Sequence, residues 1–123
     1  MTRFNREEID RYFDYGIFAG KRVLYLGSLD YDDKGDETGV DFDSFRCFIK
    51  GITYLSSISQ EPIVIQMSSV GGDFYHGMAM YDAIRSCPCH ITIIVYGYAC
   101  SMGSIILQAG DERIMAPNAV FMM

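Results

Sequence analysis

The 123-residue chain contains little proline and few basic residues. Only three residues are proline, half are apolar and 21% are charged, which is typical of a globular chain and excludes a disordered, collagen-like or low-complexity one. Ten basic residues against sixteen acidic ones give a formal net charge of −6. Because such a chain would repel a phosphate backbone, we expect no nucleic-acid partner. The length predicts one domain, residues 1–123.

An apolar leader is also missing, because the chain begins M-T-R-F-N-R-E-E. We therefore expect no secretory signal, and we expect the four cysteines to be free thiols in a reducing cytoplasm. Cys87 and Cys89 are spaced C-P-C, with no second pair and no nearby His. This is a poor zinc site, so we expect no metal. A P-loop is absent as well, which predicts that a partner and not this chain uses any ATP. We expect no cofactor.

Full charges are absent between Arg85 and Asp111, and this long uncharged segment raises the question of a membrane span. Pro88, Gly97 and Gly103 interrupt the segment, and its hydrophobic period changes partway along. We therefore expect two buried elements with a turn between them, and no membrane segment. Nineteen of the 26 charged side chains lie in residues 1–50, so the second half of the chain is predicted to be the more buried one.

Helical and strand patterns alternate along the chain. Asn5 and Asp41 are predicted helix caps, and short β-branched or apolar runs that stop at glycine, serine or a turn predict strands. Residues 28–39 are acidic and contain glycine, which predicts a solvated loop. The predicted helices are residues 5–19, 41–55, 74–86 and 102–109, and the predicted strands are 22–26, 62–67, 91–96 (ending at Gly97), 113–116 and 119–123. This alternation predicts an α/β fold of repeated β-α units with a largely parallel sheet.

Small residues follow two predicted strands, at the sheet edge where open α/β sheets usually bind ligands. The first group, residues 68–73, contains the Gly71-Gly72 pair. Two interpretations stay open for this pair. It can form a tight strand-to-helix turn, or it can turn backbone N–H groups outward to bind an anion or oxyanion.

The second group is G-Y-A-C-S-M-G-S, in which Ser101 stands between a strand and a helix. Ser101 can be a simple helix N-cap. Alternatively, its hydroxyl can be a nucleophile beside the free amide of Met102 in the first helical turn. The flanking residues differ from the G-x-S-x-G elbow of α/β-hydrolases.

Four segments resemble the ClpP family, the proteolytic subunits of Clp proteases, which are serine peptidases of the ClpP/crotonase fold. The segments are R-Y-F-D-Y-G-I-F-A-G-K-R-V-L-Y-L-G, S-S-V-G-G-D-F-Y-H-G-M-A-M-Y-D-A-I, G-Y-A-C-S-M-G-S and A-P-N-A-V-F-M-M. The resemblance implies that Ser101 is the nucleophile and that the amides of Gly72 and Met102 form the oxyanion hole. It also implies stacked heptameric rings, an AAA+ Clp unfoldase as partner, and unfolded proteins or peptides as substrates.

The chain departs from the family pattern at three places. Val70 replaces the proline of the usual S-P-G-G, and the acidic loop is about ten residues longer than usual, a length that surface loops tolerate. The family spacing also places the general-base His immediately after Met123, with the acid and the handle beyond it. We therefore expect a head domain that is incomplete at its C-terminus, and we expect the 123-residue chain alone to be inactive.

The remaining candidate groups have ordinary structural explanations. We expect His76 and His90 to be structural or surface residues, because neither occupies the position of the family's base. Cys100 is expected to point away from Ser101 and to be buried. Asp73, Asp82 and Asp111 lie near predicted helix ends and are expected to be caps or solvated charges. Besides the serine endopeptidase, two alternatives stay open: a non-catalytic ClpP-like subunit of a mixed ring, and another crotonase-type serine peptidase, such as a signal-peptide-peptidase-like or phage ClpP-like one.

Overall fold

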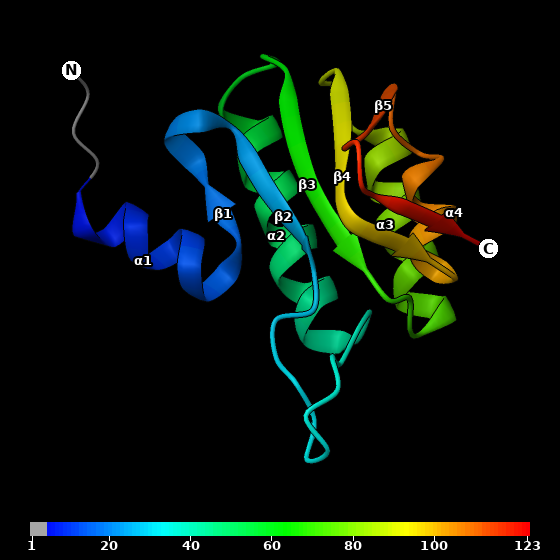
Figure 1. Ribbon diagram of the computed structural model, residues 1–123. Coiled ribbons are helices and arrows are strands. Elements are labelled where there is room, and N and C mark those ends of the chain that lie inside the picture. Colours follow the sequence, from blue (N-terminus) through cyan, green and yellow to red (C-terminus); the bar gives the residue numbers. More distant parts are fainter. Residues whose placement is uncertain (1–4) are drawn as a thin grey trace.

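A six-stranded sheet forms the centre of the molecule (Figure 1). The structure, a computed structural model, describes residues 5–123. Strands β2 (Val23–Gly27), β3 (Ile63–Ser69), β4 (Ile91–Cys100) and β5 (Glu112–Met115) lie in this order and run parallel. The short strand β1 (Ile17–Phe18) pairs antiparallel with β2, and β6 (Val120–Met122) pairs parallel with the last residues of β4. The predicted α/β fold with a largely parallel sheet is confirmed.

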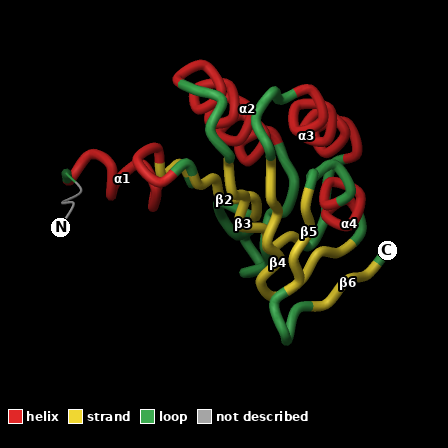
Figure 2. The backbone as a smooth tube through the Cα atoms, turned by 90° about the horizontal axis from the view of Figure 1, so that it is seen from above, coloured by secondary structure: helices red, strands yellow, loops and turns green. Residues whose placement is uncertain are grey.

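Three helices cover one face of this sheet, as Figure 2 shows. They are α2 (Phe42–Ile58), α3 (Phe74–Ser86) and α4 (Met102–Leu107). Helix α1 (Arg6–Tyr15) lies at the β1 edge and is followed by a single 3₁₀ turn, Ala19–Lys21. Within residues 5–123, no helix is long and apolar enough to cross a membrane.

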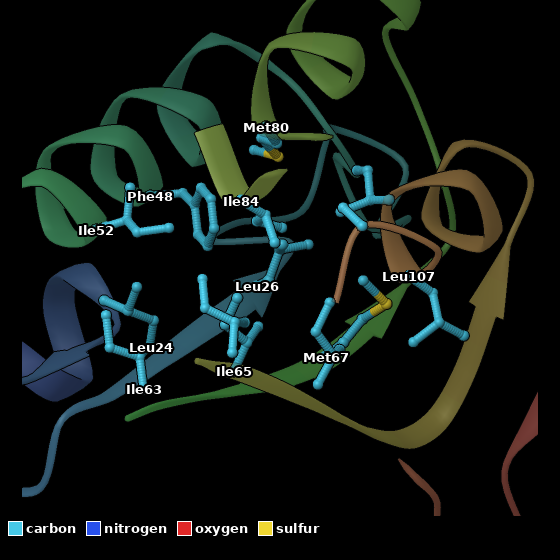
Figure 3. Close-up of a cluster of buried hydrophobic side chains, with 14 of the residues drawn as sticks. Leu24, Leu26, Phe48, Ile52, Ile63, Ile65, Met67, Met80, Ile84 and Leu107 are labelled. Carbon is cyan, nitrogen blue, oxygen red and sulfur yellow. The ribbon is translucent and has the colours of Figure 1, made fainter. Parts of the chain in front are cut away.

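The core lies between the sheet and these helices (Figure 3). Alternate residues of each central strand face it, because successive side chains of a strand point to opposite faces. Phe48, Ile52 and Leu55 of α2 pack on this layer. The strand residues that are buried there are Leu24, Leu26, Ile63, Ile65, Met67, Ile91, Ile93 and Val95.

Most of the predicted elements are present, but helix α1 ends earlier than predicted. Asn5 caps it as expected, since its side chain accepts a hydrogen bond from the Glu8 amide at 2.8 Å. The helix stops at Tyr15 and not near residue 19, because Gly16 adopts a left-handed conformation (φ 73°). The chain is then free to form β1.

Strand β4 also differs from its prediction, because it does not end at Gly97. It continues to Cys100 through an irregularity: Met67 pairs with Val95, but Ser69 pairs with Ala99. Gly97, with φ 75°, allows the extra residues to bulge. Residues before the bulge pair with β5 and those after it pair with β6. The bulge therefore redirects the end of β4, which leads into Ser101.

Residues 30–38 form what we call the acidic hairpin, which protrudes from the carboxyl edge of the sheet (Figure 1). Tyr31 bridges Glu37 in antiparallel fashion, and the Asp32 amide donates to the Asp36 carbonyl at 2.7 Å. Residues 30 to 37 are all exposed. The prediction of a solvated acidic loop is therefore confirmed, and the hydrogen bonds give this loop a definite shape.

Candidate active site

Ser101 lies at the junction between β4 and α4, in a conformation that non-glycine residues rarely adopt. Its φ is 51° and its ψ is −118°, and such backbone strain is often found at functional sites. The Ser101 amide donates to the Met122 carbonyl at 2.8 Å, while the Ser101 carbonyl accepts from the Ser104 amide at 2.9 Å. The surrounding chain thus holds the Ser101 backbone in place, and the residue itself is exposed.

The Ser101 side chain does not act as a helix cap. The hydroxyl forms no capping hydrogen bond to α4, and it has no hydrogen-bond partner among residues 5–123. A simple N-cap would use this hydroxyl to bind an amide of the first turn. The interpretation of Ser101 as an ordinary N-cap is therefore wrong, and its hydroxyl is available for other chemistry.

Gly71 brings the end of β3 directly against Ser101. A Cβ added to Gly71 would lie 2.8 Å from the Ser101 Cβ and 3.1 Å from the Met102 amide nitrogen. Gly71 also has a φ of +92°, which favours glycine. The structure therefore brings together the two groups of small residues, 68–73 and 97–103, that the sequence indicates separately.

Gly72 is fixed by a second close approach, to the backbone of Val40, two residues after the acidic hairpin. The Val40 amide donates to the Gly71 carbonyl at 2.7 Å, and the Asp73 amide donates to the Val40 carbonyl at 2.8 Å. A Cβ on Gly72 would lie 2.4 Å from that Val40 carbonyl oxygen. Val40 is a neighbour of the candidate site that the sequence analysis missed, because this pairing connects residues 32 positions apart.

Two backbone amides near Ser101 have no hydrogen-bond partner within the described part of the chain. These are the amides of Gly72 and of Met102, the first residue of α4. The neighbouring Gly71 amide is occupied, because it donates to the Ser69 hydroxyl at 3.1 Å. Unpaired amides beside a free hydroxyl are the groups that an oxyanion site requires.

Helix α3 packs against the Met102 side chain. The Met102 side chain is buried, and a Cβ on Gly77 would overlap it at 2.3 Å from Cγ. Gly77 is a second supporting residue that the sequence analysis missed. Its only signal was a glycine inside a helical pattern, which usually has a packing reason.

No hydrogen bond, ion pair or ring contact joins either histidine to Ser101 within residues 5–123. The His76 ring packs on Phe45 and Phe42 of α2, with a centroid distance of 5.2 Å to Phe45. Its Nδ1 lies 2.9 Å from Oδ2 of Asp73. His90 precedes β4, and the ten residues of this strand separate it from Ser101, a span of about 30 Å at roughly 3.3 Å per residue. The expectation of structural or surface roles agrees with both positions.

The other candidates are explained by local structure. Asp73 caps α3 as expected, accepting from the His76 amide at 2.8 Å. Asp111 accepts from the Ile91 amide at 2.8 Å and so anchors the start of β4. Cys100 is half-buried, which differs from the expectation of a buried residue. Within residues 5–123, no group of His, Cys, Asp and Glu could hold a metal ion.

Comparison with known proteins shows the family of the chain. Residues 37–123, which include the whole site, match the model of the Clp protease family. The chain belongs to the Clp protease family. It is similar to the ATP-dependent Clp protease proteolytic subunit of Deinococcus radiodurans, with 36% identity over 118 residues, covering 93% of this chain and 53% of the relative. It is also similar to subunit 1 of Salinibacter ruber, with 37% identity over 115 residues, covering 89% of this chain and 45% of the relative.

Solved structures of the family share the fold. ClpP1 from Listeria monocytogenes superposes with a TM-score of 0.71 at 23% identity, covering 82% of this chain and 55% of that chain. The chain thus spans about half the length of the relatives that it matches. The resemblance of the four sequence segments to the ClpP family is confirmed.

Proposed function

We propose that the chain belongs to a serine endopeptidase of the Clp type, in which Ser101 is the nucleophile and the amides of Gly72 and Met102 bind the oxyanion. One observation carries this proposal: the strained Ser101, whose hydroxyl is free, precedes the unpaired Met102 amide and lies against Gly71, and the amide of the next residue, Gly72, is also unpaired. Family membership and the printed names of the relatives, ATP-dependent Clp protease proteolytic subunits, support the reaction class.

The reaction follows from these positions. The Ser101 Oγ attacks the carbonyl carbon of a peptide bond while its proton passes to a histidine base, and the carbonyl oxygen becomes an oxyanion held by the two amides. The amine then leaves with that proton, and water hydrolyses the acyl-Ser101 ester. Because no contact joins His76 or His90 to Ser101 within residues 5–123, we propose that the His and the acid are supplied from outside these 123 residues.

The substrate and partners follow from the family. We propose unfolded proteins or peptides as substrates, delivered by an AAA+ Clp unfoldase that hydrolyses the ATP, in the cytoplasm. We further propose that the chain assembles with copies of itself, in heptameric rings as the resemblance implies.

A non-catalytic subunit of a mixed ring is the second candidate, and the lack of a base near Ser101 favours it. Against it, a purely structural subunit has no chemical use for a strained serine or for amides left without partners. Another crotonase-type serine peptidase would use the same Ser101 chemistry with a different partner.

Labelling with a fluorophosphonate tests the catalytic proposal, because this reagent reacts with activated serine hydroxyls. Without a base, the 123-residue chain should label negligibly and show negligible peptidase activity. The same chain extended through its downstream reading frame should label at Ser101, and Ser101→Ala should abolish that labelling. Equal labelling of the short and extended chains would show that a base lies within residues 1–123.

Self-association is predicted from the exposed apolar surface. Large apolar side chains remain exposed on several elements, including Phe13 at 78%, Phe74 at 59% and Phe121 at 45%, and such surface usually marks a contact with another chain. We expect the purified chain to form oligomers at micromolar concentration in light scattering. A sharp monomer peak would contradict this prediction.

A further inference from the structure

A cavity of about 530 Å³ lies between α1, β1 and α2, away from Ser101. Its basic side chains are Arg11, Arg46 and Lys50, and its lining includes no carboxylate of residues 5–123. Two aromatic side chains, Tyr15 and Tyr54, also face it, and each is about half exposed. We call this the basic cavity. A cavity of this size can enclose a large side chain with its neighbours.

The positive charge of the basic cavity is only partly neutralised inside the chain. Arg11 lies 3.5 Å from Glu7 and Arg46 lies 3.1 Å from Asp43. Both pairs are exposed, and exposed ion pairs contribute little to stability. The Nε of Arg46 is buried without a hydrogen-bond partner. Lys50 forms no ion pair with any residue that the structure describes. Three of the ten basic residues of an acidic chain thus converge on one cavity.

The acidic hairpin has the complementary charge. Its residues include five carboxylates and one lysine, and none of these carboxylates forms an ion pair within residues 5–123. Tyr31 stands among them with 71% of its surface exposed. An exposed tyrosine surrounded by acids suits a cavity walled by tyrosines and cations, where ring stacking and cation–π contacts form.

The hairpin is held firmly enough to act as a fixed projection. The Asp32 carboxylate accepts from the amides of Lys34 and Asp36 at 2.9 and 3.0 Å. The Tyr98 hydroxyl donates to Glu37, which ties the hairpin to β4. An ordered hairpin loses less conformational entropy on binding than a flexible one.

The hairpin and the basic cavity lie at different places on the molecule. The hairpin protrudes beyond the carboxyl edge of the sheet, whereas α1 extends from the β1 edge (Figure 1). Complementary patches at two places on one chain join copies head to tail, and such contacts close into rings or extend as filaments.

We propose that the acidic hairpin of one copy of the chain docks into the basic cavity of a second copy, with Tyr31 entering between Tyr15 and Tyr54 and the hairpin carboxylates facing Arg46 and Lys50. This inference rests on the self-association proposed above. Because exposed ion pairs are individually weak, each pair should change the association constant by about two- to fivefold, and added salt should weaken the contact.

Charge reversal, followed by rescue with the opposite reversal, tests whether charge holds the hairpin in the basic cavity. Association of the full chain is measured by sedimentation velocity at low salt. Asp33→Lys with Asp36→Lys, which leaves the Asp32 carboxylate and its hydrogen bonds in place, should weaken association about tenfold or more, and so should Arg46→Glu with Lys50→Glu. Combining all four should restore it to within about threefold of the original chain. As a control, Arg85→Glu reverses the charge of an exposed residue that belongs to neither the hairpin nor the basic cavity. It should change the association constant little. Unchanged association in both double variants, or no rescue, would overturn the proposal.

Disulfide cross-linking tests the placement of Tyr31 independently. Cys47 lines the basic cavity, so Tyr31→Cys should form an intermolecular disulfide with it under mild oxidation. Burial raises the pKa of the Cys47 thiol, so the reaction is run at alkaline pH. Non-reducing gels and peptide mapping should show the 31–47 link, and adding Cys47→Ser should remove it. Circular dichroism confirms that each variant is folded.

The outcomes separate the two proposals. Oligomers that show neither the cross-link nor the charge effect would overturn only the hairpin contact. A chain that stays monomeric would overturn the self-association and the hairpin contact together. Ser101 labelling reports on the catalytic proposal without reference to either.

Discussion

Gly71 occupies a position that a residue with a side chain could not share with Ser101. The two Cβ positions would be 2.8 Å apart, and the Cys100 carbonyl oxygen would lie 2.9 Å away. Gly71 therefore lets the end of β3 approach the proposed nucleophile, and the amide of the adjoining Gly72 has no partner among residues 5–123. Both interpretations of the glycine pair, tight turn and amide site, are compatible with this geometry.

Gly71→Ala should disable the site more than it destabilises the fold. A matched control is Gly35→Ala, because Gly35 has a similar φ of +81° but no atom within 4 Å of an added Cβ. Both substitutions place an alanine at a positive φ, which should lower the free energy of unfolding by about 1 kcal/mol. Only Gly71→Ala also displaces Ser101, so it should lower the fluorophosphonate labelling rate of the extended chain at least tenfold.

Denaturant unfolding and labelling kinetics, measured on both variants, check this prediction. Equal labelling rates for the two alanine variants would show that Gly71 does not set the position of Ser101. Loss of labelling in both would point to the hairpin, where Gly35 lies, as a part of the site.

At the residue scale, the sequence indicated the proposed catalytic groups but not the residues that pack against them. Ser101, Gly72 and Met102 stood in short patterns of small residues that follow strands, so they could be recognised locally. Val40 and Gly77 could not, because each contacts the site from a distant part of the chain. In the sequence, Val40 is an ordinary valine before a helix and Gly77 an ordinary glycine within one, so neither stands out.

Helices α1 and α2 begin with similar caps but stabilise the molecule differently. Asp41 accepts from the Ser44 amide at 2.8 Å, and the Ser44 hydroxyl accepts from the Asp41 amide at 3.0 Å, forming a capping box. Asn5 accepts from Glu8 at the same distance of 2.8 Å. Helix α2 buries Phe48, Ile52 and Leu55, whereas α1 buries no residue. The cap of α2 is therefore coupled to the core.

Asp41→Ala should lower the free energy of unfolding by about 1–2 kcal/mol, the usual value of a lost N-cap. Asn5→Ala removes the same kind of hydrogen bond from a helix outside the core, so it should change the global stability by less than about 0.5 kcal/mol. Urea unfolding monitored by circular dichroism measures both. Equal destabilisation by the two variants would mean that α1 is part of the cooperative core.

The elements most accurately predicted were those with clear local signals at both ends. Helix α3 was predicted as residues 74–86 and is found there, because Asp73 caps it and Pro88 follows it closely. Strand β4 was predicted too short, because Gly97 resembles a strand end when only the sequence is read. Pairing with β6 on one side and β3 on the other carries the strand past this glycine.

At the scale of the whole molecule, the charged first part of the chain forms the proposed contact surfaces, and the less charged second part forms the candidate site. Most charged residues lie in the first fifty positions, which contain the acidic hairpin and every basic residue of the basic cavity. The nearly uncharged second half contains β3, β4 and α4, which build the site. The sequence predicted this division into an exposed and a buried half, but the placement of cavity and hairpin depends on the tertiary fold.

The most direct test of the account is a crystal structure of the extended chain after reaction with a fluorophosphonate. We predict a phosphorus atom bonded to the Ser101 Oγ, with the phosphonyl oxygen about 2.7–3.1 Å from the amide nitrogens of both Gly72 and Met102. An adduct on another residue, or a phosphonyl oxygen that contacts neither amide, would contradict the assignment of this site.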